Sequence, residues 1–310
     1  MASRELTGKT VLVTGGAGFI GTHLTRALAA DNDVIVLDDC SSGDPDRLPT
    51  DIEFVRGDVR DQTTIEEVVE PVDIIFHQAA LVSVTRSVSD PRASHTRNAH
   101  GTLEVLEAAR RHDTRVVLAS SAAIYGRPQQ LPIDEGHPKE PISPYGLDKL
   151  SLDHLGRLYH DLYDLETVCL RYFNVYGPGQ PTNEYSGVIS VFRDRARTDD
   201  ELPIFGDGNQ TRDFVHVDDV VTANCLAATT DCVGGAYNVG TGRRVSITEL
   251  AELIVEQTDS SGELVYHPSR EGDVRHSEAD ISKAQNELEF EPTVSLEQGI
   301  QGLTARMEVQ

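Results

Sequence analysis

The sequence predicts an α/β fold in which a Rossmann-type, doubly wound parallel sheet is followed by a smaller α+β C-terminal lobe. Short apolar, β-branched runs alternate with helix-length amphipathic segments through the first half of the chain, as in a parallel sheet with crossover helices. A glycine-rich turn follows the first run. After Asn174 the alternation gives way to loops rich in Gly and Pro, which indicates a second kind of architecture.

The expected elements follow this alternation in order. The apolar runs have few polar positions, so helices should cover both faces of the sheet. These runs, the predicted strands, are residues 10–14, 33–38, 73–77, 115–119 and 167–171, with a further strand ending before Gly57. Predicted helices lie near 19–30, 61–70, 92–112, 145–163, 217–229 and 246–257, and Asp61 and Ser143-Pro144 are start signals for two of them.

The charge of the chain restricts its partners. With 51 acidic and 27 basic residues the net charge is -24, so nucleic acid and anionic membrane surfaces would meet a repulsive field. A composition rich in acid and poor in Lys and aromatic residues resembles that of proteins from cells with molar salt, where screening relieves self-repulsion. An ordinary acidic cytosolic protein is the alternative. No stretch approaches the ~18 apolar residues of a membrane span, and the N-terminus lacks an apolar signal region, so we expect a cytoplasmic protein.

The cysteines give no support for a metal or redox site. Cys40, Cys169, Cys225 and Cys232 form no C-x-x-C pair, and no His spacing accompanies them. Cys169 falls in a strand-like run and is expected in the core. We therefore predict no metal.

A dinucleotide site is predicted at the turn after the first strand. Gly15, Gly18 and Gly21 let the backbone turn tightly and approach a pyrophosphate. The phosphates would then lie at the N-terminus of the helix that begins with Phe19 and Ile20, where free backbone N–H groups and the helix dipole favour an anion.

The second strand indicates which dinucleotide is bound. Asp38 closes this strand, where a carboxylate accepts hydrogen bonds from the adenosine ribose hydroxyls, and Asp39 beside it would repel a 2'-phosphate. The predicted cofactor is therefore NAD rather than NADP. Asp58 and Val59 follow the third strand and are expected beside the adenine.

The fourth strand ends in small residues. Ala79 and Ala80 allow the backbone to pass close to the dinucleotide, whereas His77 before them is expected to be a packed histidine rather than a catalyst.

Tyr145 and Lys149 are the predicted chemical centre. A spacing of four places both side chains on one face of a helix, so the ammonium can lower the pKa of the phenol and prepare it for proton transfer. Nine Tyr and four Lys in 310 residues give roughly 0.1 such pairs by chance, which favours a functional pair. Ser121, at the end of the preceding strand, is the third expected member.

These residues resemble the extended short-chain dehydrogenase/reductase family, in particular its NAD-dependent nucleotide-sugar epimerase/dehydratase group, and are most similar to its UDP-glucose 4-epimerases. The motifs that carry the resemblance are spread over most of the chain: 14–21, 119–126, 145–149, 171–178, 210–219 and 270–273. The resemblance implies a UDP-sugar substrate and a homodimer joined by the helices near 92–112 and 145–163.

The resemblance also implies a role for each matching residue. Asn98 and Phe173 would support the nicotinamide end of the cofactor site. The residues that would contact the substrate are Ser83, Ser121, Tyr145, Asn174, Arg212, Arg270, Asp273 and Ser277. Arginines suit a diphosphate because they form bidentate, charge-assisted hydrogen bonds. The small Ser277 would border the sugar's C2 substituent and leave room for an N-acetyl group.

By this resemblance Tyr145 takes the proton from a sugar hydroxyl while hydride leaves the same carbon for NAD, Ser121 hydrogen-bonds that oxygen, and Lys149 also contacts the nicotinamide ribose. Related dehydratases carry Asp-Glu after the serine and decarboxylases carry Glu, but here both positions are alanine, Ala122 and Ala123. Because alanine moves no proton, reversible oxidation and reduction remains, as in a 4-epimerase.

Three alternatives stay open. Arg275 or Arg86 could meet the carboxylate of a uronic acid, which would make the protein a UDP-glucuronate epimerase. A relative of the dehydratases and decarboxylases with an unusual acid/base is the second. A non-catalytic NAD-binding sensor is the third, although it would not need Ser121, Tyr145 and Lys149 together.

The expected domains follow from these assignments. Residues 1–175, with 212–239 returning to them, should form the NAD-binding Rossmann domain, and residues 176–211 and 240–310 should form the lobe that binds the nucleotide sugar.

Overall fold

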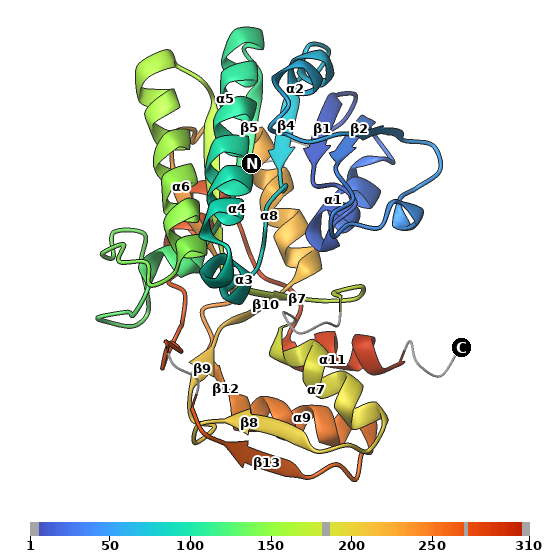
Figure 1. Cartoon of the computed structure of the whole chain (residues 1–310), viewed down its shortest axis with the longest axis vertical. Helices are drawn as coiled ribbons and strands as arrows, with labels where there is room; N and C mark the ends of the chain where they lie inside the picture. Colours follow the sequence, from blue (N-terminus) through green and yellow to red (C-terminus); the bar gives the residue numbers. More distant parts are fainter. Residues whose placement is uncertain (1–5, 182–186, 270–271, 306–310) are drawn as a thin grey trace.

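A seven-stranded parallel sheet forms the centre of the computed structural model, which describes residues 6–181, 187–269 and 272–305 (Figure 1). Strand order runs outward from β1 in both directions, which is the Rossmann arrangement and confirms the predicted fold class. In their order across the sheet the strands are β3 (Glu53–Arg56), β2 (Asp33–Asp38), β1 (Thr10–Thr14), β4 (Ile74–His77), β5 (Arg115–Ser121), β6 (Thr167–Tyr172) and β11 (Ala236–Val239).

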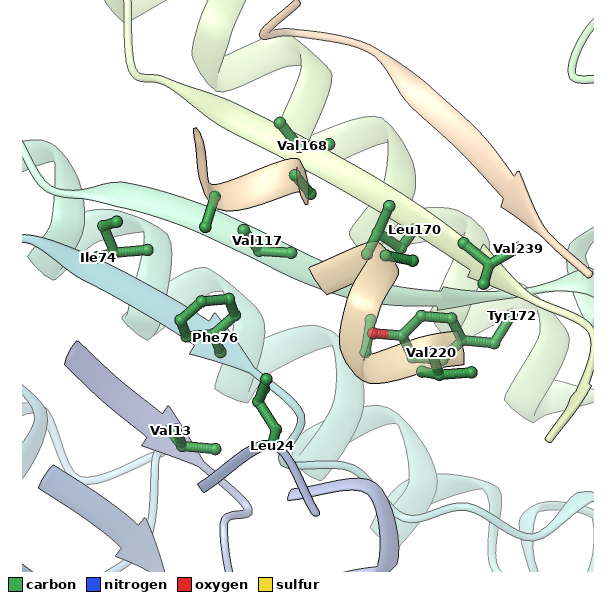
Figure 2. Close-up of a cluster of buried hydrophobic side chains, with 14 of the residues drawn as sticks. Val13, Leu24, Ile74, Phe76, Val117, Val168, Leu170, Tyr172, Val220 and Val239 are labelled. Atoms are coloured by element: carbon green, nitrogen blue, oxygen red, sulfur yellow. The ribbon is translucent and has the colours of Figure 1, made fainter. Parts of the chain in front are cut away.

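One face of this sheet packs against α1 (Phe19–Leu28) and α8 (Val217–Thr229). Figure 2 shows this layer: side chains from β1, β4, β5, β6 and β11 lie on the same side of the sheet as Leu24 of α1 and Val220 of α8. Because successive side chains of a strand point to opposite faces, these residues are alternate positions of otherwise apolar runs. The labelled strand residues are Val13, Ile74, Phe76, Val117, Val168, Leu170, Tyr172 and Val239.

The intervening positions, such as Leu12 and Leu118, form the core of the opposite face. They pack against three helices, α2 (Gln62–Val69), α5 (Gly101–His112) and α6 (Pro144–Tyr163). Both faces are thus covered, as the scarcity of polar strand positions predicts.

Two of the predicted helix starts are capped by the expected residues. The Asp61 carboxylate accepts from the backbone N–H of Thr63, and the Ser143 hydroxyl accepts from that of Gly146. These bonds satisfy N–H groups that have no partner within the helix, and Pro144, which has no N–H to satisfy, occupies the first position of α6.

The helix predicted over 92–112 is not continuous. It consists of α4 (Pro91–His95), a wide π turn (Thr96–His100) and α5. Within the π turn the Asn98 side chain bonds both backbone groups of Leu81, with Oδ1 accepting from N over 2.7 Å and Nδ2 donating to O over 3.2 Å. The π turn therefore carries a specific contact, as such turns often do at functional sites.

Below the main sheet in Figure 1 lies a second layer with its own apolar core. Parallel strands β8 (Leu202–Phe205) and β13 (Leu264–His267) pack there with α7 (Val188–Arg197), α9 (Ile247–Thr258) and α11 (Leu296–Ala305). Two short pairs lie between the layers: parallel β7 (Asn174–Tyr176) with β10 (Phe214–His216), and antiparallel β9 (Thr211–Arg212) with β12 (Val245–Ser246).

The remaining elements are short. They are the 3-10 turns at Pro45–Arg47 and Ala122–Tyr125, α3 (Val84–Ser89) and α10 (Ser282–Leu288). α10 packs its Ala284 and Leu288 into the core of the main sheet rather than into the second layer.

Candidate active site

The glycine turn between β1 and α1 has the geometry of a cofactor cradle. Gly15 has φ +69°, and a Cβ there would lie 2.6 Å from the backbone N of Ala79. A Cβ on Gly21 would lie 2.1 Å from the carbonyl oxygen of Gly15. Both positions therefore require glycine, and the close approach keeps the loop compact at the N-terminus of α1.

Asp38 is fixed against this loop. Its Oδ2 accepts from the backbone N of Ala17 over 3.0 Å and its Oδ1 accepts from that of Cys40 over 2.8 Å. Burial raises the pKa of Asp38, and these two N–H bonds oppose the rise. The structure thus presents a carboxylate beside the glycine turn, where it would accept hydrogen bonds from the ribose hydroxyls of NAD.

Other predicted cofactor residues lie around this cradle with different degrees of exposure. Phe19 and Ile20 are half-buried in the first turn of α1, and Ala80 is half-buried after β4. Val59 belongs to the apolar core beneath. Asp58 is partly exposed and pairs with Arg60, whose hydrogen bonds lower the pKa of Asp58.

The loop after β4 is held by a contact from the π turn and by the cap of α3. Asn98 fastens Leu81 as described, and the Ser83 hydroxyl accepts from the backbone N of Arg86 to cap α3. Ser83 is half-buried and Asn98 is buried. Asn98, the predicted nicotinamide support, therefore bonds to the loop that leads to Ser83, the predicted substrate contact.

The three predicted catalytic residues come together where β5 meets α6. Tyr145 and Lys149 are buried in the first turns of α6, and Ser121 ends β5. Ser121 makes a side-chain hydrogen bond with Tyr145. Lys149 Nζ donates to the carbonyl oxygen of Ala119 over 2.7 Å and lies 6.0 Å from the centre of the Tyr145 ring.

The electrostatics of this corner differ from the prediction. Burial raises the pKa of Tyr145, and the hydrogen bond with Ser121 opposes the rise. Burial lowers the pKa of Lys149 to about 8, against the opposing charge of Asp148. The predicted lowering of the phenol's pKa is not seen because burial of the phenol outweighs the contact that opposes it, and spacing on a helix does not reveal burial.

His77 is a buried member of the sheet. Its Nδ1 lies 2.8 Å from the Thr14 hydroxyl and its Nε2 lies 3.0 Å from the Thr102 hydroxyl. Burial lowers its pKa to about 3, so the ring is neutral at physiological pH, in keeping with a packed residue.

The residues predicted to hold the substrate cluster where the two layers meet. Arg212 is largely buried and forms an ion pair with Asp273. Ser277 is 8% exposed and its backbone N donates to the carbonyl of Thr211, beside Arg212. The Asn174 side chain donates to the carbonyl of Asp213 over 3.0 Å. Burial lowers the pKa of Arg212, and Asp273 opposes this.

Phe173 and Arg270 are two further predicted site residues. Phe173 is buried in a small core beside Tyr125, directly before Asn174. Arg270 lies outside the residues that the structure describes.

Asp213, to which the sequence analysis assigned no role, lies among the predicted substrate residues. Its buried carboxylate accepts four hydrogen bonds: from the N and the hydroxyl of Thr241, and from the N of Gly242 and of Ala279. Asp213 follows Arg212 in the sequence, and its carbonyl accepts a hydrogen bond from the Asn174 side chain. It therefore connects the loops that carry the predicted substrate residues. A carboxylate flanked by Arg212 and the apolar Phe214 was the available signal.

Arg275, one of the two arginines considered for a sugar carboxylate, is paired with an aspartate. Its guanidinium forms two hydrogen bonds to Asp207 over 2.6 and 2.7 Å, with both side chains more than half exposed. Of the two arginines considered for a uronic acid, this one is engaged at the surface of the second layer.

Among residues 6–181, 187–269 and 272–305, no group of three or more metal-ligating side chains lies close enough to hold an ion. In the same part of the chain no helix is long and apolar enough to cross a membrane.

The glycine cradle, the anchored Asp38 and the Ser-Tyr-Lys corner at the carboxyl ends of a Rossmann sheet define an enzyme of the extended short-chain dehydrogenase/reductase type. The chain belongs to the NAD dependent epimerase/dehydratase family, whose model matches residues 11–240. NAD is accordingly its cofactor, and the cradle fits it because a close backbone approach and a carboxylate anchored beside the glycine turn are both present.

Relatives with assigned activities are similar over almost their whole length. The UDP-glucose 4-epimerase of Mycolicibacterium smegmatis is 39% identical, with 93% of this chain and 95% of the relative covered. The UDP-glucose 4-epimerase of Thermotoga maritima, solved with UDP-glucose, has a TM-score of 0.93 at 38% identity over 97% of this chain and 100% of the other. The UDP-N-acetylglucosamine 4-epimerase of Methanobrevibacter ruminantium, solved with UDP-N-acetylmuramic acid, has a TM-score of 0.94 at 34% identity, covering 98% and 99%.

Proposed function

We propose that this protein is an NAD-dependent 4-epimerase of UDP-hexoses that interconverts UDP-glucose and UDP-galactose through a 4-keto sugar. NAD, when bound, accepts a hydride from C4 of the sugar and returns it, and its positive ring favours the phenolate form of the nearby tyrosine. The groups that handle the proton are those of the buried corner, Ser121, Tyr145 and Lys149.

Tyr145 removes the proton from the 4-hydroxyl as the carbon is oxidised and gives it back as the ketone is reduced. Its raised pKa means that a phenolate needs positive charge beside it, which the Lys149 ammonium provides. Ser121 hydrogen-bonds with Tyr145 and so can hold the substrate oxygen in line with it. Burial of Tyr145 and Lys149 excludes water that would compete for the proton.

The observation that carries the proposal is what lies directly after Ser121. The 3-10 turn Ala122–Tyr125 begins with two alanines, which can neither donate nor accept a proton. Elimination of water and decarboxylation need an acid or base at this place, whereas epimerisation at C4 needs only the proton exchanged with Tyr145. The ketone is therefore reduced again in the same site.

The range of UDP-sugars that the enzyme accepts is a second part of the proposal. Ser277 is small, and its backbone N donates to the carbonyl of Thr211, the neighbour of Arg212. It therefore lies at the edge of the predicted sugar site. A small side chain there leaves space at C2, so UDP-N-acetylglucosamine should be accepted together with UDP-glucose.

The test is to purify the protein in high salt and incubate it, without added cofactor, with UDP-galactose, UDP-N-acetylglucosamine and UDP-glucuronate in parallel. Chromatography should show the 4-epimers of the first two. A product only from UDP-glucuronate would favour the uronate epimerase, a dehydrated product would favour a dehydratase relative, and NAD bound without any turnover would favour a sensor.

We also propose a homodimer through α5 and α6. Large apolar side chains stand exposed along these adjacent helices, which a monomer would leave in water. They are Leu103, Leu147, Leu158, Leu162 and Tyr163. Light scattering should give a dimer for the protein and a monomer for Leu158→Glu; a monomer for the unaltered protein would contradict this.

We also propose a cytoplasmic protein that works at molar salt. The net charge of -24 supports the salt requirement, because salt screens the repulsion among the acidic groups. Melting temperature and activity should rise with added KCl. A steady fall of both from low salt upward would rule this out.

We propose that the two layers bind different molecules. Residues 1–175 with 212–239 bind NAD, and residues 176–211 and 240–310 bind the nucleotide sugar, with α10 returning to the main sheet.

A further inference from the structure

Asp148 lies between Tyr145 and Lys149 in the sequence of α6, and the reaction proposed above gives it no role. Its side chain is 3% exposed, so its charge has been removed from water. A buried carboxylate is costly unless neighbouring groups hydrogen-bond or pair with it. The hydrogen-bond partners of Asp148 therefore show which groups stabilise its buried carboxylate.

Two side chains of α4 hold the Asp148 carboxylate. The Ser94 hydroxyl donates to Oδ2 over 2.5 Å, and His95 Nδ1 lies 2.9 Å from Oδ1. Because a carboxylate only accepts, Nδ1 of His95 carries the shared proton. His95 itself is two-thirds exposed, so the buried carboxylate has one partner in the interior and one at the surface.

The same cluster reaches the cofactor side of the site. Asn98 Nδ2 lies 3.4 Å from the Ser94 hydroxyl, and Asn98 Oδ1 accepts from the backbone N of Leu81 in the loop after β4. Asp148 is thus part of a hydrogen-bonded chain that runs from α6 through α4 and the π turn to this loop.

Among the residues that the structure describes, Asp148 supplies the negative charge that acts on Lys149, whereas the other groups facing Lys149 are uncharged. From β4 the site is faced by His77, which is neutral because burial lowers its pKa to about 3. From α6 it is faced by the uncharged phenol of Tyr145, and from β5 by the Ala119 carbonyl that accepts from Nζ. Asp148 is the group whose charge opposes the effect of burial on the pKa of Lys149.

We propose that Asp148 is a positioning residue for the reaction, a role that rests on the proposed function: its carboxylate, fixed by Ser94 and His95, keeps Lys149 in the ammonium form. Without that negative charge, a buried ammonium loses its proton at lower pH. The charge next to Tyr145 would then be missing at the pH where the enzyme works.

The direct test is the titration of Lys149 in the NAD-bound protein, followed by NMR of lysines labelled with ¹³C at Cε. The chain has only four lysines, so the Lys149 signal is identified by its loss in Lys149→Met. In Asp148→Asn, which keeps the shape but not the charge, the midpoint should fall by about one pH unit. Asp161→Asn removes an exposed carboxylate further along α6 and should leave the midpoint unchanged.

An unchanged Lys149 midpoint in folded Asp148→Asn overturns the proposal. If that variant does not fold, the smaller Asp148→Ser tests the same loss of charge. In the epimerase assay the alkaline limb of kcat should move down with the midpoint while KM stays constant; a loss of kcat that is equal at every pH also overturns it. A shifted midpoint in a protein that epimerises none of the sugars supports the electrostatic role and contradicts the proposed function, so the two failures are distinguishable.

Discussion

Arg171 and Arg275 each form a close ion pair with an aspartate, in two very different parts of the molecule. Arg171 bonds Asp153 over 2.7 and 2.8 Å where β6 meets α6, and the two side chains are 2% and 0% exposed. Arg275 bonds Asp207 over 2.6 and 2.7 Å at the edge of the second layer, where the side chains are 55% and 52% exposed.

The difference lies in the surroundings rather than in the distances. The buried pair also reaches the corner of the proposed catalytic residues, because Asp153 belongs to the same helix as Lys149 and accepts from Ser120, the neighbour of Ser121, over 3.3 Å. Removing water makes each charge there both costly and influential, whereas solvent screens the exposed pair. We therefore expect substitutions in the buried corner to have larger effects than those at the exposed edge.

The largest effect should come from Tyr145→Phe. It removes the hydroxyl that exchanges the proton and should lower kcat for UDP-galactose by about 10²- to 10⁴-fold, with NAD still bound. Tyr163→Phe at the exposed end of α6 is the matched control and should keep full activity. Equal activities of the two variants would contradict the assignment of Tyr145.

The two ion pairs can be compared directly by their contribution to stability. Arg171→Met leaves Asp153 buried without its main partner and should reduce the free energy of unfolding by about 3–5 kcal/mol. Arg275→Met should leave the midpoint of urea unfolding unchanged. Similar losses for both variants would show that burial does not separate the two regions.

The ion pair of Arg212 is intermediate between these two pairs, because Arg212 is largely buried and its partner Asp273 is exposed. Arg212→Gln should raise KM for the UDP-sugar by about 10- to 100-fold, the value of one or two charge-assisted hydrogen bonds, with a smaller change in kcat. Arg275→Gln should leave KM as it is. Unchanged KM in Arg212→Gln would remove Arg212 from the nucleotide site.

The pH dependence should reflect the buried lysine. As pH rises through the Lys149 pKa of about 8, the ammonium is lost and kcat should fall, by up to about tenfold per pH unit above it. Stability moves the other way: the folded protein releases this proton before the unfolded chain does, so this group's contribution to the free energy of unfolding increases between about 8 and 10.5. A kcat that is flat up to pH 10 would contradict this.

The sequence predicted the regular part of the fold well because its signals are local. Apolar runs such as 10–14 and 33–38 became buried strands, and Asp61 and Ser143 begin the expected helices. The π turn around Asn98 could not be predicted, since it depends on the contact with Leu81, which is distant in the sequence.

The candidate site shows the same limit. Tyr145, Lys149 and Ser121 could be selected from their order and spacing, but the direction of the Tyr145 pKa depends on burial by the rest of the fold. The role of Asp213 depends on loops at Thr241 and Ala279 that reach it from other parts of the chain. Arg275 had the right charge for a sugar carboxylate, and only the structure shows Asp207 beside it.

The central claim is that hydride leaves C4 of the sugar and returns to C4 within one site. The most direct measurement is to incubate the NAD-bound protein with UDP-galactose carrying deuterium at C4 and to analyse the product by NMR and mass spectrometry. We predict UDP-glucose that retains the deuterium at C4. Deuterium at C6, loss of the label to solvent, or the absence of any epimer would contradict the account.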